Sequence, residues 1–522
     1  MFLSELPQEI LLNISQYISL KDRDSCSYVC KAWKAPFQES MYFDLFVDTI
    51  QNLEKWCRTL DDPGYTKQDT GRILRSLHLG YCIRLTSEQL YTIQKTFPSI
   101  KSLYLQNLYL KPAFVGTKTD WSLWKSLTEL RIDFYETHGT EPDNAFINTV
   151  SNLPLLRRLD LGGNAFNCVH QTFTMSDFEL LHTRLIHLKD LRLSSYSLDL
   201  SESDFELMTE VLPAKKITFF SIISNNTDHR WLYYLARKYL NLEMLKFSSG
   251  NKNDESEEQR NDIISLLRSL AHPFQHLVGL DVGDPNYPFK EFLLFWELVV
   301  FLKIPLRHLG VYACEVLSDR MTSEVLQDLT KVAMKMCSSR FSETINELTF
   351  SCQKPMEIPT DLIKRTDVFH YPLDPFQLDD LLDEKIFLQS LYFSGANIGT
   401  NPKSFSISKR YRLRSVEANG SKLTSYVLRY LSFYCRNFDT VNLRFTKLFG
   451  SITSIRGCPF IDLTYTRFLS LYMMRTFFII NDSPKSEDSP NITLVIRPVS
   501  DIPPKEDVSI AIFVIGAQKM YM

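Results

Sequence analysis

The sequence LRSLHL at residues 74–79 has the pattern that decides the fold of this chain. Apolar residues occupy its first, fourth and sixth positions, so its second half alternates as a strand with one buried face requires. The same pattern returns many times along the chain. Its clear copies begin at Leu74, Ile100, Leu127, Leu156, Leu188, Leu242, Leu277, Leu306, Ile345, Leu388, Leu413 and Phe438, with weaker candidates at Ile217, Ile461 and Ile492.

The spacing of the copies predicts the architecture. From Leu77 to Leu191 the middle apolar residue advances by 26, 27, 29 and 32 residues. Leucine-rich repeats run about 20–29 residues, and each is a short strand followed by a helix. Helix-like stretches lie between the strands at 87–97, 204–212, 231–239 and 424–435. Since each unit leaves one apolar face bare, neighbours must stack, and we predict an α/β solenoid of leucine-rich repeats, a horseshoe.

We expect these repeats to occupy residues 71–522, with insertions around 251–262 and 354–386. The segments 251–262, 482–490 and 498–507 are charged or contain proline, which favours solvated loops, and we expect 356–384 to form projecting loops. The role of the segment 482–522 stays open. Within it, Val508–Ile515 is apolar and β-like, which favours a capping strand.

Residues 1–40 have a different, helical pattern. Leu6 and Pro7 open it, and proline suits a first helical turn because its missing N–H would be unpaired there. The pattern then predicts one wide apolar helical face and, after a cap at Asp22 or Asp24, a second helix. The apolar residues of the first helix are Ile10, Leu11, Ile14, Tyr17 and Ile18, and those of the second are Cys26, Val29, Cys30 and Trp33. About 40 residues cannot bury this much apolar surface alone, so another surface should cover part of it.

This stretch resembles an F-box. The resemblance rests on two motifs, Leu-Pro-x-Glu-Ile beginning at Leu6 and Val-Cys-Lys-x-Trp ending at Trp33. The cysteine-containing repeats behind it resemble those of F-box/leucine-rich-repeat proteins. The resemblance implies docking to the Skp-type adaptor of an SCF, or cullin–RING, ubiquitin ligase. It implies adaptor contacts by Leu6, Pro7, Ile10, Leu11, Ile14, Tyr17, Ile18, Val29 and Trp33. The alternative is a helical hairpin packed on the rest of the chain.

Residues 41–70 join the two parts. Met41–Val47 alternates as a strand does, Thr49–Leu60 has a helical apolar side, and Asp61–Gly64 is a strong turn. A solenoid needs its first face covered, so we interpret this segment as an amino-terminal cap that holds the F-box at a fixed orientation.

Composition excludes several classes of partner and location. The net charge of −3 gives no reason to expect nucleic acid or an anionic membrane as a partner. Ten cysteines lie scattered without a CxxC pair, which favours reduced thiols in a cytoplasmic or nuclear protein. The most apolar run, Phe292–Leu302, is shorter than the about 20 residues that span a bilayer, so we predict a buried helix there.

The sequence contains no pattern that predicts catalysis. It has no GxGxxG or Walker-type loop and no GxSxG motif. His272 and His276 have the spacing of a metal pair, but Pro273 lies between them and an exposed turn is the preferred interpretation. We therefore expect no cofactor, no metal and no enzymatic activity. An active site hidden in residues 311–391 or after 450 is the alternative.

The positions on either side of each middle apolar residue should form a partner-binding surface. The candidate target-binding residues are Tyr104, Arg131, Arg158, Arg192 and Lys246. Together with Lys216, the four basic side chains could suit an acidic or phosphorylated segment. Interleaved carboxylates at Glu129, Asp133, Asp160 and Asp190 leave a neutralised surface equally open. For the copy at Ile217 we expect Lys216 and Thr218 as the flanking residues.

The resemblance to F-box/leucine-rich-repeat proteins implies a substrate-recognition subunit of an SCF ubiquitin ligase, with the repeats holding a protein target. Catalysis would lie in other subunits, and this chain would supply proximity. A non-degradative F-box scaffold is the main alternative. The sequence leaves open the target, any need for its phosphorylation, and the oligomeric state.

Overall fold

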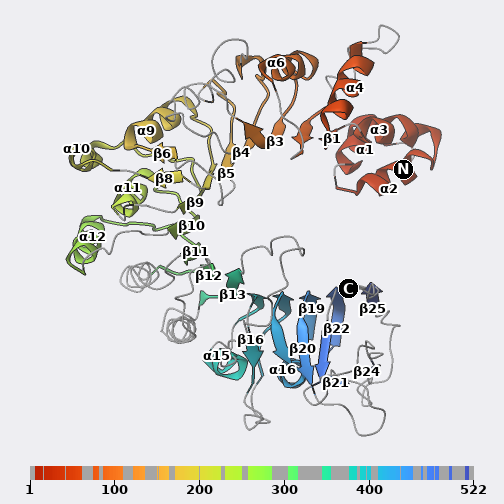
Figure 1. Ribbon diagram of the computed structural model, residues 1–522, viewed down its shortest axis with the longest axis vertical. Coiled ribbons are helices and arrows are strands. Elements are labelled where there is room, and N and C mark those ends of the chain that lie inside the picture. The colour runs from red at the N-terminus through yellow and green to blue at the C-terminus, as the bar shows by residue number, and fades with distance from the viewer. Residues whose placement is uncertain are drawn as a thin grey trace, which may run out of the picture. The chain divides into compact units, whose positions relative to one another are not determined.

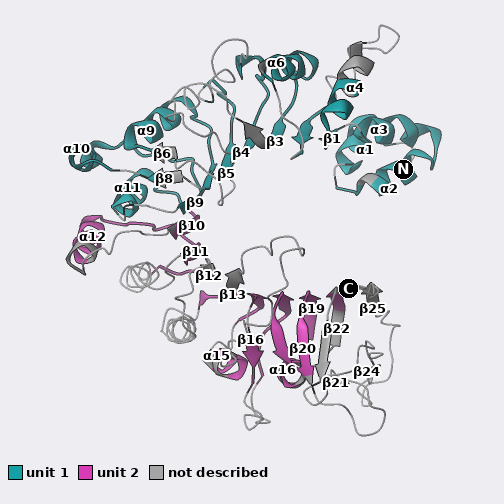
Figure 2. Ribbon diagram, viewed as in Figure 1, with its two compact units in different colours: residues 1–242 teal, residues 243–522 magenta. Residues whose placement is uncertain are grey.

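The computed structural model divides the chain into two compact units, residues 1–242 (unit 1) and 243–522 (unit 2), coloured in Figure 2. It describes residues 6–15, 17–41, 43–61, 74–80, 86–109, 121–135, 150, 152–163, 171–194, 196–198, 200–224, 228, 230–249, 257–284, 304–314, 344–353, 376–384, 388–395, 397–400, 410–435, 437–450, 460–462, 467–474, 477–480, 493–495 and 512–515. The predictions for 292–302, 482–490 and 498–507 lie outside these residues.

Unit 1 begins with three short helices where the sequence predicts two. They are α1 (Gln8–Ser15), α2 (Leu20–Ser27) and α3 (Lys31–Met41). The carbonyl of Pro7 accepts hydrogen bonds from the N–H groups of Ile10 and Leu11, as expected for a proline-led helix start. The cap predicted at Asp22 or Asp24 is wrong. Ser19 is the N-cap of α2, because its hydroxyl accepts from the N–H of Asp22 and donates to the Asp22 carboxylate at 2.6 Å.

A parallel sheet follows the helices in unit 1. Each strand pairs with the next in chain order, and helices lie along one face of the strands (Figure 1). The strands are β1 (Asp44–Val47), β2 (Ser76–Leu79), β3 (Ser102–Tyr109), β4 (Glu129–Tyr135), β5 (Arg158–Gly163), β7 (Asp190–Ser194) and β9 (Phe219–Ser224). The intervening elements are α4 (Ile50–Asp61), α6 (Ser87–Thr96), η2 (Trp121–Leu123), a pair β6 (Gln171–Phe173) and β8 (Tyr196–Leu198), α9 (Met175–Arg184), α10 (Glu202–Leu207), η3 (Met208–Glu210) and α11 (Trp231–Lys238).

The strand register of unit 1 follows the sequence pattern. The middle residues Leu77, Leu103, Leu130, Leu159 and Leu191 are mutual partners across five strands, and all are buried. The open face of unit 1 is defined here as the sheet face that carries the residues on either side of these leucines.

One copy of the pattern has a different middle residue from the predicted one. Phe220, not Ile217, pairs with Leu191. Ile217 occupies the first position of its copy, so the flanking residues of β9 are Phe219 and Ser221. The prediction that Lys216 and Thr218 flank the middle residue is therefore wrong.

Unit 2 continues the strand–helix alternation. Its main parallel sheet contains β10 (Met244–Ser249), β11 (Gly279–Asp284), β12 (His308–Cys314), β13 (Glu347–Gln353), β15 (Ser390–Ser394), β17 (Ser415–Asn419), β19 (Asn437–Arg444), β22 (Arg467–Met474) and β25 (Ile512–Ile515). A second parallel sheet contains β14 (Phe376–Gln377), β16 (Asn397–Gly399), β18 (Lys422–Thr424), β20 (Lys447–Gly450) and β23 (Phe477–Ile480), and a separate pair is β21 (Phe460–Asp462) with β24 (Thr493–Val495). Its helices are α12 (Glu257–Ser269), α15 (Leu378–Glu384) and α16 (Ser425–Tyr434).

Two expected loop regions of unit 2 contain helices. Helix α12 includes residues 257–262, and α15 lies within the segment expected to project. Leu378, Leu381 and Leu382 of α15 are buried, so their apolar contacts outweigh the acidic residues that suggested a loop. At the other end of this unit, β25 confirms a strand within 508–515, where Ile512–Ile515 pairs with β22.

A buried polar network joins α9 to α11 in unit 1. The side chain of Lys238 is 3% exposed, and its Nζ lies 2.6 Å from Oε2 of Glu179. Tyr234 donates to the other carboxylate oxygen at 2.7 Å, and His182 shares a 2.8 Å hydrogen bond with the Tyr239 hydroxyl. Burial, aided by the charge of Lys238, lowers the pKa of His182 to about 3. Neighbouring helices in this unit are thus joined by polar as well as apolar contacts.

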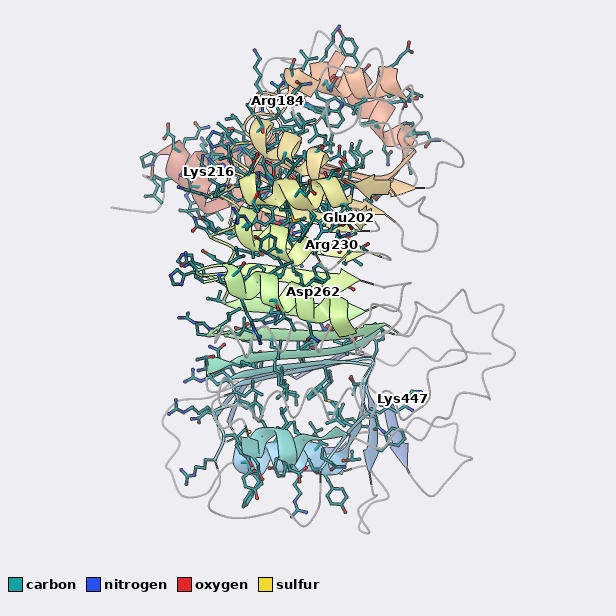
Figure 3. All side chains as sticks on the ribbon, turned by 90° about the vertical axis from the view of Figure 1, so that its left-hand side faces the viewer. Arg184, Glu202, Lys216, Arg230, Asp262 and Lys447 are labelled. Carbon is teal, nitrogen blue, oxygen red and sulfur yellow. The ribbon has the colours of Figure 1, made fainter. Side chains whose placement is uncertain are left out.

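A second polar contact lies at the start of α11. Arg230, labelled in Figure 3, forms an ion pair with Glu202 of α10 at 2.7 Å and another with Asp228 at 2.6 Å.

Candidate functional site

The three helices of unit 1 bury one set of apolar residues and expose another. Leu11 and Phe37 are 1% exposed. Phe43, which directly precedes β1 in the sequence, is also buried, at 3% exposed. In contrast, Tyr17 is 89% exposed, Tyr28 77% and Val29 64%. Large apolar side chains left in water at this density indicate a surface that another molecule covers.

The predicted adaptor contacts fall into three groups. Pro7, Ile10, Ile14, Tyr17 and Val29 are exposed, and Ile10 and Ile14 share one face of α1 because they are four residues apart. Half-buried residues are Leu6, Ile18 and Trp33.

Leu11 forms the third group on its own. It belongs to the interior of the helical unit, so we leave it out of the candidate surface.

Tyr28 is an exposed aromatic residue that the sequence reasoning missed. It lies in the connection between α2 and α3, where helical periodicity gives no signal. Its position directly before Val29, in a short connection between two helices, was the available clue. We add Tyr28 to the candidate surface.

Arg23 joins the helices to the sheet. It is buried, and its Nε donates to the carbonyl oxygens of Ser15 at 2.8 Å and Ile18 at 3.1 Å. Its Nη1 donates to the carbonyl of Ser40 at 2.9 Å and lies 3.5 Å from the carboxylate of Asp44 in β1. A single guanidinium thus satisfies three backbone acceptors of the helical unit and contacts the first strand.

Residues 3–48 match the family model for F-box-like domains. The chain contains an F-box-like domain. The match covers α1, α2, α3 and β1, so the first strand of the sheet lies within the matched residues. The comparison with curated proteins found no match to this chain.

An aromatic ladder runs from β1, at the end of the F-box-like domain, across the strands that follow it. Phe46, His78, Tyr104 and Arg131 pair in register on four neighbouring strands of the open face. The rings of Phe46 and His78 stack at 4.4 Å, His78 meets Tyr104 edge-on at 5.6 Å, and the Arg131 guanidinium lies 4.4 Å from the centre of the Tyr104 ring. Burial lowers the pKa of His78 despite the nearby Asp44, so this imidazole is neutral near pH 7.

Carboxylates of the chain itself pair with Arg131. The guanidinium lies 3.4 Å from Asp133 and 3.7 Å from Asp160. The Tyr104 hydroxyl donates to Asp133 at 2.7 Å, and burial together with this carboxylate raises the pKa of Tyr104 to about 12. Tyr104 therefore stays a hydrogen-bond donor at neutral pH.

The other two candidate arginines of unit 1 share one carboxylate. Arg192 donates two hydrogen bonds of 2.9 Å to the two oxygens of Asp190, and Arg158 lies 3.5 Å from the same group. The Arg192 guanidinium also lies 4.3 Å from the centre of the Phe219 ring. These pairings favour the neutralised surface over a free basic surface for an acidic target.

Lys246 lies in unit 2 and is also paired. Its ammonium group contacts the carboxylate of Asp281, which bonds the ring of His308 at 2.7 Å. The other ring nitrogen of His308 lies 3.4 Å from Glu347. Burial opposes the charged form of His308, but the hydrogen bond and charge of Asp281 outweigh it and raise the pKa of His308. Burial also opposes the charge of Asp281, and its bonds to His308 and Lys246 lower its pKa all the same.

The described residues offer no metal site. Among them, no group of three or more His, Cys, Asp or Glu side chains is placed to hold a metal ion. His272 and His276 are both exposed between α12 and β11. In the same part of the chain that the structure describes, no helix is long and apolar enough to cross a membrane.

Proposed function

We propose that this chain is a substrate-recognition subunit of an SCF-type cullin–RING ubiquitin ligase. The F-box-like domain docks a Skp-type adaptor, and the strand–helix units form a leucine-rich-repeat horseshoe that holds a protein target. The chain makes no covalent bond itself and acts in the cytoplasm or nucleus by bringing the target near the catalytic subunits.

The exposed apolar side chains of the F-box-like domain carry this proposal. Burying a side chain of the size of Val29 or Ile14 against a partner contributes about 1.5–3 kcal/mol. Several such residues on one small domain are enough for a specific protein contact once their loss of freedom is offset. Binding of a Skp-type adaptor is what an F-box-like domain implies.

The regular register of the sheet supports the repeat part of the proposal. Middle leucines that pair across parallel strands, with helices such as α6 and α9 in the connections between strands, are typical of stacked repeats that share one core. Small-angle X-ray scattering on the full chain bound to its adaptor tests the horseshoe, because a curved solenoid has a longer maximum dimension than a globular protein of equal mass.

A pull-down with purified adaptor tests the docking role. Tyr28→Ser and Val29→Asp together should abolish retention, because they remove apolar area and place a charge in the contact. Leu212→Asp is the matched control, since Leu212 is equally exposed at 77% but lies outside the F-box-like domain. If the wild-type chain is not retained at micromolar concentration, the proposal is wrong.

A scaffold without degradative function is the second candidate. Comparing protein abundance in cells that carry the wild-type chain and the Tyr28/Val29 variant separates the two. A ligase receptor predicts targets that accumulate with the variant, whereas a scaffold predicts unchanged abundance and altered association.

A further inference from the structure

The open face of unit 1 contains the same three-part arrangement twice. Each copy has an aromatic ring, an arginine over that ring, and an aspartate bonded to the arginine. The two sets are Tyr104, Arg131 and Asp133, and Phe219, Arg192 and Asp190. In both sets, the arginine cation is stabilised by the aromatic ring and by the carboxylate. Both aromatic rings of these sets are therefore paired with a cation.

Phe46 is a third ring on this face, and among the residues that the structure describes no arginine lies over it. Its side chain is 67% exposed, and one side of the ring stacks on the neutral His78. Phe46 lies on β1, the first strand in the order of the sheet, so no further strand of unit 1 supplies a residue on its other side.

Carboxylates flank this ring. Asp44 lies two residues before Phe46 on β1, so the alternation of the strand directs it to the same face, and Asp48 lies two residues after Phe46, directly past the end of β1. Asp44 already contacts Arg23, whereas no cation among the described residues lies within ion-pair distance of Asp48. Gly80 makes room for this group, because a Cβ at Gly80 would lie 2.9 Å from Oδ1 of Asp48.

The charges left over on the face are negative. Arg131, Arg158 and Arg192 are all engaged by aspartates, while Glu129 is exposed and has no cation within ion-pair distance among the described residues. Charge complementarity therefore favours a cationic binding partner and disfavours an acidic or phosphorylated one.

We propose that the open face around Phe46, Asp48 and Glu129 binds a basic segment of a partner protein, with an arginine or lysine side chain lying over the Phe46 ring. The bound side chain completes at Phe46 the arrangement that Arg131 and Arg192 make internally. This inference deepens the target-binding part of the proposed function by naming the class of target, and it does not depend on adaptor docking.

Fluorescence anisotropy on the full chain tests this proposal. The probe is a labelled peptide in which arginine alternates with glycine and serine, compared with peptides that carry glutamate or phosphoserine in place of arginine. The arginine peptide should bind, and its affinity should fall as salt is raised because the contact is exposed. Equal or tighter binding of the glutamate or phosphoserine peptide would overturn the proposal.

Variants locate the contact. Phe46→Ala should weaken arginine-peptide binding by about 2–5-fold, the range of an exposed cation–π contact. Adding Asp48→Asn and Glu129→Gln should bring the loss to about 10-fold or more. Glu206→Gln, an exposed carboxylate on α10, is the matched control and should bind like wild type. Wild-type binding by the combined variant would contradict the proposed location.

Adaptor retention is measured on the same variants. It should stay unchanged, which separates failure of this inference from failure of the docking proposal. If Phe46→Ala alone abolishes adaptor retention, the ring belongs to the adaptor surface and the basic-segment proposal falls.

Discussion

Arg23 lies 3.5 Å from Asp44 and thereby links a helix of the F-box-like domain to the first strand of the sheet. The arginine is buried and also satisfies carbonyls that end α1 and α3, so the pair lies at the centre of the junction. The proposed role as a substrate receptor requires a docking domain held at a set orientation to the rest of the chain. This contact provides a physical means of doing so.

Replacing Arg23 by methionine should loosen that junction. The carbonyls of Ser15 and Ser40 would keep the backbone N–H donors of Ile18 and Phe43 but lose the charged guanidinium donor, and a hydrogen bond to a charged group contributes about 1.5–3 kcal/mol. We expect a lower urea midpoint and faster proteolysis between the helices and β1. Lys21→Met, an exposed position on the same helix, is the control. An unchanged midpoint would show that the junction does not depend on Arg23.

Alanine substitutions at Leu11 and Ile14 should have different effects, because the first reduces stability and the second reduces adaptor binding. Leu11→Ala should lower the free energy of unfolding by about 2–5 kcal/mol, because Leu11 is buried. Ile14→Ala, at a position 41% exposed, should change stability by no more than about 0.5 kcal/mol yet weaken adaptor binding by about 1 kcal/mol or more. Calorimetry of unfolding and titration with adaptor give the two values. Equal behaviour of the two variants would contradict the division between core and surface.

The pair of Lys238 and Glu179 should behave as a buried ion pair. Glu179→Gln leaves the lysine charge buried without its partner and should cost about 3 kcal/mol, the lower end of the usual range because Glu179 is one-third exposed. The double variant Glu179→Leu with Lys238→Met should recover much of that loss. Urea unfolding of the three proteins checks this, and a double variant weaker than Glu179→Gln would refute it.

The stability of unit 1 should fall in mild acid because of His182. Its pKa is lowered to about 3 in the folded state from an ordinary value near 6.5, so the unfolded state takes up the proton first. Stability is therefore retained above pH 6.5 and decreases as the pH falls toward 3, by up to about 1.4 kcal/mol per pH unit. Unfolding of His182→Gln across this range should show a shallower dependence. The same slope in the variant would assign the effect to other groups.

The strands were predictable from the sequence because one buried face produces an alternation that can be counted directly. Helices such as α6 and α16 were predictable from apolar residues that recur every three to four positions between the strands. Helix α15 was missed because its acidic residues dominate the composition of the segment, although its leucines at 378, 381 and 382 are buried.

The contacts that organise the candidate site were less accessible. Arg23 donates to backbone carbonyl oxygens, which every residue has, so no pattern of side chains in the sequence predicts its partners. The arginines of the open face could be located from the pattern, but their neutralisation depends on distances between strands. Phe46 was not a candidate because its strand lies before the first recognised copy of the repeat.

The constant register of unit 1 determines where the chain can change length. Middle leucines are 26 to 32 residues apart from Leu77 to Leu191, yet they stay paired in one row. Variation in repeat length is therefore confined to the connections between strands. It does not change the row of side chains on the open face. An epitope tag inserted in a connection should be tolerated, whereas one residue added inside a strand would turn the following side chains to the opposite face.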